Sequence, residues 1–364
     1  MNAGEFTWRS ESGVPRPSNL REVDDTLTAD AAFRLASEGV ALVWRSDYHN
    51  ARQLLSAMAR RAERKRGGAK PSSLLDVFHL HRKQQAERAR ILGRLLVRVE
   101  GDYAIALPRA PDVREALAEA WGPADGGPSL VALRELLGLV GAHEWRRKGV
   151  EIPALDARMH PHYGVFSPVR GEYLDLIAQA PLPSTRLAFD IGTGTGVIAA
   201  LLARRVVQRV VATDVDERAL ACARENIHRL GFDAQVEVVR ADLFPPGRAP
   251  LVVCNPPWLP GRASSPIERA LYDEDSRMLK GFLSGVAAHL DDRGEAWLVM
   301  SDFAELLGLR APGEIESWIA NAGLAVVAKD SVKPRHPKAA DRDDPLHAAR
   351  SREITSLWRL TAQR

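Results

Sequence analysis

Several features that define common protein classes are scarce or missing in this 364-residue sequence. Only two cysteines are present, Cys222 and Cys254, and each stands in an apolar stretch, which excludes a disulfide framework and fits a reducing cytoplasm. No Cys/His cluster has the spacing of a zinc site, so we expect no metal. The N-terminus lacks the layout of a signal peptide, and no uncharged run is long enough to cross a bilayer. We therefore expect a soluble cytoplasmic protein without a membrane partner.

Excess charge of one sign is also scarce, since the net charge is only +3, but basic residues gather in one region. Between Arg52 and Arg94 the sequence has twelve Lys or Arg residues and three acids. A basic helical region of this kind suits a surface that binds RNA phosphates. It is equally consistent with a solvated helix face, and both interpretations stay open here.

Two sequence patterns meet near residue 150. Residues 1–28 are polar and aperiodic, which predicts a flexible arm. Residues 29–150 show mostly helical periodicity, which predicts a mainly helical N-terminal domain for substrate docking. Within it we expect helices over about 29–66 and 74–94, a β-hairpin over 95–108, and two helices flanking a break at 122–129.

Residues 151–364 alternate strand-like apolar runs with helical segments. This alternation predicts an α/β fold in which helices cover both faces of a parallel sheet. Two late runs, 324–332 and 353–360, are joined by a long polar link and suit an antiparallel pair at the sheet edge. The expected parallel strands are 187–191, 209–214, 236–242, 250–255 and 295–301.

A glycine-rich turn follows the first expected strand. Asp190 precedes it, Gly192, Gly194 and Gly196 have the spacing G-x-G-x-G, and Thr193 lies inside it. Glycines let the chain turn sharply off a strand and let a ligand lie against the backbone. By itself the motif is also compatible with a plain strand-to-helix turn. Its spacing disfavours a nicotinamide dehydrogenase, which would carry G-x-G-x-x-G.

Acidic residues close the next two strands. Asp214 follows Gly196 by 18 residues, where a carboxylate can bind both hydroxyls of a ribose. Asp242 stands beside Leu243 and Phe244, where an adenine would meet polar and apolar groups. Either acid could instead cap a helix. Because the carboxyl ends of parallel strands share one edge, however, acids at three successive strand ends favour a nucleotide-like ligand.

The motif N-P-P-W (255–258) emerges at the same edge, after the fourth strand. An amide or aromatic amine nitrogen is a poor nucleophile because its lone pair is delocalised. The Asn255 side-chain oxygen and the Pro256 carbonyl can accept hydrogen bonds from its N–H groups and so localise that pair. The two prolines stiffen the turn, and Trp258 offers a flat face for stacking. The alternative interpretation is a proline-rich loop with one packed tryptophan.

Together, D-I-G-T-G-T-G (190–196), T-D-V-D (213–216), A-D-L-F (241–244) and N-P-P-W resemble class I S-adenosylmethionine (SAM) dependent methyltransferases with a methyltransferase small domain. Over about residues 155–330 the chain is similar to the group of HemK-like protein glutamine methyltransferases and ribosomal RNA guanine-N2 methyltransferases. The resemblance implies a Rossmann-like seven-stranded domain and SAM as cofactor. Trp258 departs from the Tyr or Phe usual in those two groups and occurs among adenine-N6 enzymes, so this position does not select a substrate.

The resemblance also implies roles for individual residues. The glycine turn would wrap the methionine end of SAM, and Asp190 would bind its amino group. Asp214 would hold the ribose. The loop 164–168 would close over the cofactor, and His160 and His162 just before it are candidates for substrate contact. The implied cofactor-binding residues are Asp190, Gly192, Thr193, Gly194, Gly196, Asp214, Asp242, Leu243, Phe166 and Asn255, and the implied catalytic residues are Asn255, Pro256 and Trp258.

The leading hypothesis is therefore an N-methyltransferase that modifies a planar nitrogen of a macromolecule, with a base of ribosomal or transfer RNA ahead. The first alternative is a protein glutamine N5-methyltransferase of a translation factor or ribosomal protein. A second alternative is a tailoring enzyme for a small molecule. The intact Asn255 disfavours a catalytically dead RNA-binding module.

Overall fold

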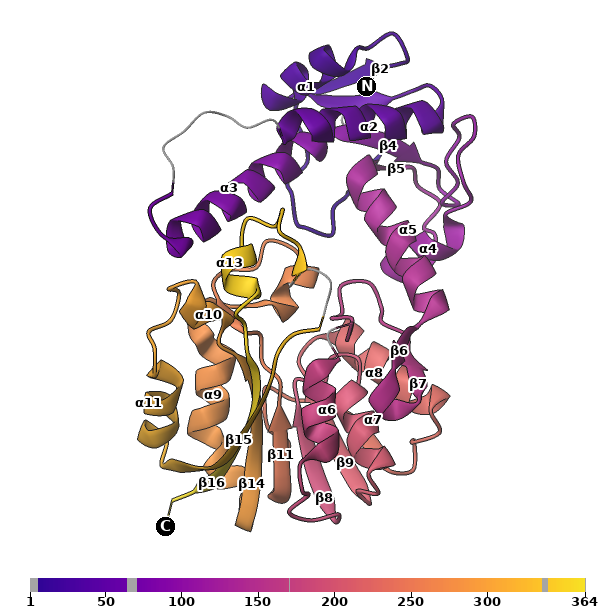
Figure 1. The fold of residues 1–364 in the computed structure, drawn as a ribbon. Helices are drawn as coiled ribbons and strands as arrows, with labels where there is room; N and C mark the ends of the chain where they lie inside the picture. Colours follow the sequence, from indigo (N-terminus) through magenta and orange to yellow (C-terminus); the bar gives the residue numbers. More distant parts are fainter. Residues whose placement is uncertain (1–5, 64–70, 170, 336–339, 364) are drawn as a thin grey trace. The chain divides into compact units, whose positions relative to one another are not determined.

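A computed structural model describes residues 6–63, 71–169, 171–335 and 340–363 of the chain (Figure 1). They form two compact units, each described here by itself. The N-terminal unit comprises residues 1–72 and 79–144, and the C-terminal unit comprises residues 73–78 and 145–364.

The N-terminal unit is built on a five-stranded mixed sheet with the order β1-β5-β4-β3-β2. Strands β2, β3 and β4 are parallel to one another, β5 is antiparallel to β4, and β1 is parallel to β5. Val43, Leu96 and Leu130 form one apolar cluster with Trp8. The strands are β1 (Thr7–Arg9), β2 (Leu20–Val23), β3 (Ala41–Trp44), β4 (Leu95–Val99) and β5 (Ser129–Ala132), and the helices wholly or partly in this unit are α1 (Ala29–Ser37), α2 (Tyr48–Ala62), α3 (Leu74–Leu92), α4 (Arg114–Trp121) and α5 (Leu133–Lys148).

This sheet corrects the prediction of a flexible arm followed by a mainly helical domain. Residues 7–9 and 20–23 of the expected arm are strands, and the helix expected over 29–66 is interrupted by β3. All four residues of β3 are buried. A strand buried on both faces shows no alternation of apolar and polar residues, so periodicity alone did not separate it from the neighbouring helices.

The β-hairpin predicted over 95–108 is wrong. Only β4 is a strand there, and its antiparallel partner is β5. The chain turns after β4, where the Glu100 N–H donates to the Ala104 carbonyl at 2.8 Å. A Cβ on Gly101 would lie 2.1 Å from the Gly126 carbonyl oxygen. The glycine interpreted as a hairpin turn instead permits a close approach of two backbone segments.

The C-terminal unit contains a seven-stranded sheet with the order β10-β9-β8-β11-β14-β16-β15. Strands β10, β9, β8, β11 and β14 are parallel, whereas β16 is antiparallel to both β14 and β15 and lies between them. The predicted α/β fold and its late antiparallel pair are confirmed. The strands are β8 (Leu187–Ile191), β9 (Arg209–Asp214), β10 (Val236–Arg240), β11 (Ala249–Cys254), β14 (Leu290–Ser301), β15 (Leu324–Val332) and β16 (Thr355–Ala362).

Short elements and helices complete this unit. Two small sheets pair β6 (Val150–Ile152) with β7 (Ala157–Met159) and β12 (Leu259–Pro260) with β13 (Tyr272–Asp273). The helices are α6 (Glu172–Gln179), α7 (Val197–Arg204), α8 (Glu217–Arg229), α9 (Arg277–Val286), α10 (Phe303–Leu306), α11 (Glu314–Asn321) and α13 (His347–Arg350), with 3-10 turns at Pro153–Leu155, Ile267–Ala270, Glu274–Ser276 and Ala287–His289. None of the helices in the described ranges is long and apolar enough to span a membrane.

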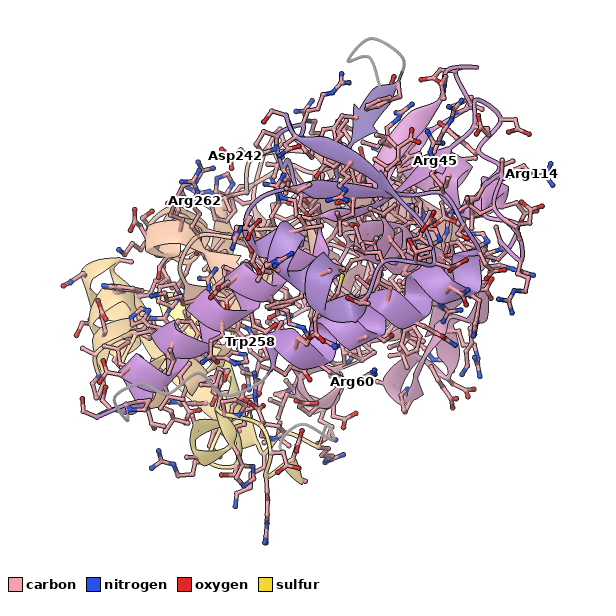
Figure 2. The ribbon with its side chains drawn as sticks, turned by 90° about the horizontal axis from the view of Figure 1, so that it is seen from above. Arg45, Arg60, Arg114, Asp242, Trp258 and Arg262 are labelled. Atoms are coloured by element: carbon pink, nitrogen blue, oxygen red, sulfur yellow. The ribbon has the colours of Figure 1, made fainter. Side chains whose placement is uncertain are left out.

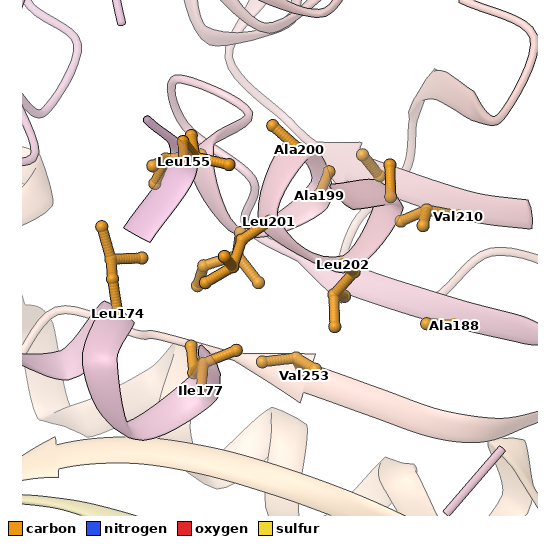
Figure 3. Close-up of a cluster of buried hydrophobic side chains, with 14 of the residues drawn as sticks. Leu155, Leu174, Ile177, Ala188, Ala199, Ala200, Leu201, Leu202, Val210 and Val253 are labelled. Atoms are coloured by element: carbon orange, nitrogen blue, oxygen red, sulfur yellow. The ribbon is translucent and has the colours of Figure 1, made fainter. Parts of the chain in front are cut away.

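Two apolar clusters cover the two faces of the large sheet. Successive residues of β11 point to opposite faces, so Val253 joins the cluster of α6, α7 and α8, while Val252 joins the cluster of α9 and α11. Figure 3 shows Leu201 and Leu202 of α7 beside Val253 and Ile177. Seven of the eight residues of α7 are buried apolar residues, which is typical of a helix that lies in a core rather than on a surface.

The strand order positions the site. The connection that leaves β8 leads to β9 on one side, and the connection that leaves β11 leads to β14 on the other side. The two connections therefore diverge at the carboxyl edge of the sheet. In open α/β sheets, ligands bind at such a switch point, outside the carboxyl ends of the strands.

Candidate functional site

The glycine turn joins the end of β8 to the start of α7. Gly192, Gly194 and Gly196 have φ values of +72°, +55° and +81°, which favour glycine at each position. A Cβ on Gly192 would lie 2.4 Å from the Met278 Cε, and one on Gly196 would lie 3.2 Å from the Ala223 Cα. Nothing lies within 4 Å of a Cβ on Gly194. The turn therefore packs at its ends and leaves open space at its middle.

Asp190 holds this turn in place through hydrogen bonds. Its side chain is fully buried, and Oδ2 accepts hydrogen bonds from the Thr193 hydroxyl at 2.6 Å and the Ala199 N–H at 3.1 Å. Its other oxygen, Oδ1, has no hydrogen-bond partner among the described residues. Burial raises the pKa of Asp190 to about 7. The site thus holds a carboxyl group with one unused oxygen, which a cationic or N–H donor can satisfy.

Asp214 ends β9 and binds the same turn. Its two carboxylate oxygens accept hydrogen bonds at 3.0 Å from the Gly194 N–H and the Asp216 N–H. Burial raises the pKa of Asp214. The alternative role of helix N-cap belongs to Asp216, whose side chain accepts the Arg218 N–H at 2.8 Å at the start of α8. Asp214 is therefore not the cap. A carboxylate has about four acceptor positions, so after the N–H groups of Gly194, Val215 and Asp216 it can still accept a hydroxyl group.

Asp242 lies just beyond β10, with a side chain that is 73% exposed and 3.8 Å from Arg277 (Figure 2). The next residue, Leu243, has a φ of +69°, and its carbonyl accepts the Thr213 hydroxyl at 2.6 Å. Its side chain lies against Gly281 of α9, where a Cβ would be 2.8 Å away. Asp242 and Leu243 follow β10, which is separated by β9 from the strand that leads into the glycine turn. Their contact with an adenine stays a prediction.

Asn255 follows β11 directly, and its Oδ1 accepts a hydrogen bond from the Trp258 indole N–H at 2.9 Å. Its side chain also interacts with the hydroxyl of Tyr173, a fully buried residue of α6. Pro256 is buried, and Trp258 is half-buried and packs against the clusters on both faces of the sheet. The sequence predicted a flat aromatic face for stacking at Trp258. The structure adds that the polar edge of this ring, its N–H, already donates a hydrogen bond to Asn255.

The loop before α6 lies beside α8. Val165 packs on Ala219 and Cys222, while Phe166 is half-buried. A Cβ on Gly164 would lie 3.1 Å from the Pro266 Cβ, so this loop touches the segment that follows N-P-P-W. The predicted role of Phe166 as a residue that covers the cofactor stays a prediction.

His160 and His162 are both held by α8. The His160 N–H donates to Asn226 at 2.7 Å, and a His162 ring nitrogen lies 2.8 Å from Glu225. Although burial opposes it, hydrogen bonds from Arg229, His162 and Arg146 lower the pKa of Glu225 to about 2. These contacts hold the loop against α8, and the substrate contact for which the sequence made both histidines candidates stays a prediction.

Sequence reasoning missed two residues of the site. Tyr173 occupies an apolar position of an ordinary helical pattern, so no motif pointed to its hydroxyl. Met278 is the second residue of α9, and its side chain covers Gly192. This contact is visible only in the folded chain. In the part of the chain that the structure describes, no three His, Cys, Asp or Glu residues are grouped as metal ligands.

Comparison with known proteins identifies the domain that carries this site. Residues 157–310 match the family described as methyltransferase small domain. The segment includes the glycine turn, the strand-end acids and N-P-P-W, and it confirms the resemblance to class I methyltransferases, a family that uses SAM.

Curated relatives match parts of the chain. A tRNA1(Val) (adenine(37)-N6)-methyltransferase of Bacteroides thetaiotaomicron is 32% identical over 130 residues, which are 34% of this chain and 55% of that protein. A release factor glutamine methyltransferase of Moorella thermoacetica is 36% identical over 104 residues, which are 28% of this chain and 37% of that protein. The chain spans about half, or less, of the length of these relatives. Among solved structures, a methyltransferase from Pyrococcus furiosus is 21% identical with a TM-score of 0.40, covering 56% of this chain and 89% of that one.

The residues of this matched segment fit SAM. The open space over Gly194 leaves room for a ligand against the backbone, which a side chain would fill. The unused oxygen of Asp190 suits an ammonium group, and the remaining acceptor position of Asp214 suits a ribose hydroxyl. Among the described residues, only hydroxyl and backbone N–H groups hydrogen-bond these two carboxylates, so a cationic ligand would supply the missing positive charge.

The raised pKa of Asp190 predicts a pH-dependent affinity for SAM. The free protein favours the protonated carboxyl below about pH 7, while the cationic donor favours the carboxylate, so binding should release a proton. We expect the affinity to fall up to about tenfold per pH unit below about pH 6 and to level off above about pH 8. Calorimetry in buffers of different ionisation enthalpy measures both effects. The variant Asp190→Asn should bind weakly without this pH dependence, and equal wild-type affinities at both ends of the range would contradict the assignment.

The open space at Gly194 predicts a separable effect on binding. Gly194→Ala should weaken SAM binding about tenfold or more, because the added methyl group occupies the space left for the ligand. Gly313→Ala is the matched control, since Gly313 also has a positive φ and nothing within 4 Å of its Cβ position but stands at the start of α11. Both variants should lose about 1 kcal/mol of stability in thermal or urea unfolding. Equal SAM affinities of the two variants would place the ligand elsewhere.

Proposed function

We propose that the protein is a SAM-dependent methyltransferase that modifies a planar nitrogen of a macromolecule in the cytoplasm, most readily a base of ribosomal or transfer RNA. The observation that carries the proposal is the register of two neighbouring strands. Cys254 of β11 pairs with Ile191 of β8, so Asn255 and Gly192 leave adjacent strands at the same level. The N-P-P-W motif and the glycine turn thus begin at neighbouring strand ends, which supports the proposal.

The proposed chemistry follows from the atoms at these strand ends. Asp190, Asp214 and the glycine turn hold the donor, which when bound supplies an electrophilic methyl group. The second lone pair of the Asn255 Oδ1 and the carbonyl of Pro256 accept hydrogen bonds from the amino group of the substrate. Preorganised acceptors of this kind stabilise the positive charge that develops on the nitrogen. The nitrogen then loses its proton to water, so the reaction needs no general base.

The tRNA adenine-N6 relatives and the basic helices of the N-terminal unit favour RNA. Arg52 and Arg60 are exposed and lie about two turns apart on α2. Arg60 is labelled in Figure 2. Two other cations of the basic region are paired, Arg61 with Asp30 at 2.6 Å and Arg88 with Glu63 at 2.8 Å. Residues 64–70, which carry four more of its cations, lie outside the described residues. We propose that the N-terminal unit docks RNA through phosphate contacts.

A protein substrate is the second candidate. Two of the relatives are release factor glutamine methyltransferases, and a side-chain amide of glutamine presents the same planar NH₂ group to Asn255. Such a partner would be a translation protein, and its binding should depend less on salt than that of RNA.

Asn255→Ala tests the acceptor motif. This variant should keep its affinity for SAM and lose methyl transfer by about 100- to 1,000-fold, because the lost oxygen acts on the transition state. Asp214→Ala is the complementary variant and should weaken SAM binding itself. Calorimetry and transfer of a tritiated methyl group measure the two effects separately. A fully active Asn255→Ala protein would rule out the nitrogen mechanism.

The substrate class is tested with labelled donor and cell extract as acceptor. If RNA is the substrate, the label should disappear on RNase treatment and survive protease. The double variant Arg52→Gln/Arg60→Gln should raise KM for the RNA fraction several-fold and flatten the salt dependence of binding. Label that resists RNase and is lost to protease would instead support the glutamine candidate, and label that passes a filter retaining macromolecules would contradict both.

A further inference from the structure

The amide of Asn255 has two ends of similar shape and opposite hydrogen-bonding character. Only the oxygen end can accept an N–H group of the substrate, since the nitrogen end carries two donors. A rotation of the amide by half a turn would therefore present donors to a donor. The proposed chemistry requires something that sets this orientation.

The indole of Trp258 makes the first contact that sets it. An indole N–H can donate a hydrogen bond but cannot accept one, so its 2.9 Å partner must be the amide oxygen. Trp258 is itself held, because its half-buried ring packs against the apolar clusters on both faces of the sheet. The N–H is thus presented from a fixed ring at the end of a stiff Pro256–Pro257 turn.

The hydroxyl of Tyr173 makes the second contact. Tyr173 is fully buried in α6, and its hydroxyl interacts with the Asn255 side chain from another element of the unit. Burial, together with the nearby Asp190 and Glu172, raises the pKa of this phenol, so it stays a neutral hydroxyl. A hydroxyl can accept from the amide nitrogen, which leaves the second lone pair of the oxygen for the substrate.

We propose that Trp258, through its indole N–H, and Tyr173, through its hydroxyl, are positioning residues that hold the Asn255 amide with its oxygen toward the acceptor nitrogen. The inference rests on the proposed function. It assigns to Trp258 a role for its polar edge, in addition to the stacking face that the sequence predicts. It also assigns a role to Tyr173, which belongs to no motif.

Trp258→Phe tests the role of the edge, because it removes the N–H and keeps an aromatic ring. We expect kcat for methyl transfer to fall about 10- to 100-fold, with KM for the acceptor and the affinity for SAM within about threefold of wild type. Trp297→Phe is the matched control, since the buried Trp297 indole donates to Glu295 at 2.8 Å and not to Asn255. A lower kcat confined to Trp258→Phe supports the proposal, and equal kcat values of the two variants overturn it.

Tyr173→Phe removes only the hydroxyl and should lower kcat by about tenfold. Tyr103→Phe is its control, because Tyr103 is a buried tyrosine of the N-terminal unit whose hydroxyl donates to the Pro123 carbonyl. In the Asn255→Ala background, neither Trp258→Phe nor Tyr173→Phe should reduce the remaining activity further. A further loss of the same size as in the wild type would show that these residues act independently of Asn255.

The contact itself is tested without substrate by the NMR signal of the Trp258 indole N–H, assigned through its absence in Trp258→Phe. The signal should shift in Asn255→Ala and stay unchanged in Trp297→Phe. An unchanged signal in Asn255→Ala overturns the positioning proposal even if the wild type transfers methyl groups. A wild-type protein that transfers no methyl group to any extract fraction overturns the proposed function, whatever the NMR signal shows.

Discussion

The pairing of β8 with β11 is the constraint on which the site depends. Ile191 and Cys254 are register partners at the end of these strands, and both are fully buried. Successive apolar residues of β11 belong to two separate clusters, one on each face of the sheet. A slip of one residue would turn each side chain toward the opposite cluster and disturb the packing of both. The hydrophobic core thereby fixes the level at which a donor loop and an acceptor motif leave the sheet.

The carboxylates around this edge fall into two kinds. Asp190 is buried and Asp214 is half-buried among backbone N–H groups and hydroxyls, and burial raises both pKa values. Glu225 is surrounded by arginines and a histidine, which lower its pKa. The first kind is electrostatically incomplete without a cation, and the second is complete within the chain. This difference separates groups kept for a ligand from groups that hold a loop in place.

The sequence allowed the C-terminal sheet and the motif residues to be predicted, since these strands are longer and end in side chains with recognisable chemistry. It did not reveal β1, β2 and β3, which are three or four residues long, and it mistook Gly101 for a hairpin turn. The contacts of Trp258 and Tyr173 with Asn255 were also beyond it. Periodicity shows which side of a helix is buried, but it does not show which buried hydroxyl meets which amide.

Strand β16 lies between β14 and β15, although it follows both along the chain. Strand β15 therefore has no backbone partner in the sheet until residues 355–362 are available. A nascent chain that has emerged from the ribosome only as far as β15 would expose the open edge of β14 and an unpaired strand together. The sheet can therefore be completed only after β16 has been synthesised. Until then, chaperones would bind a domain in which the glycine turn is already formed but the edge of the sheet is still open.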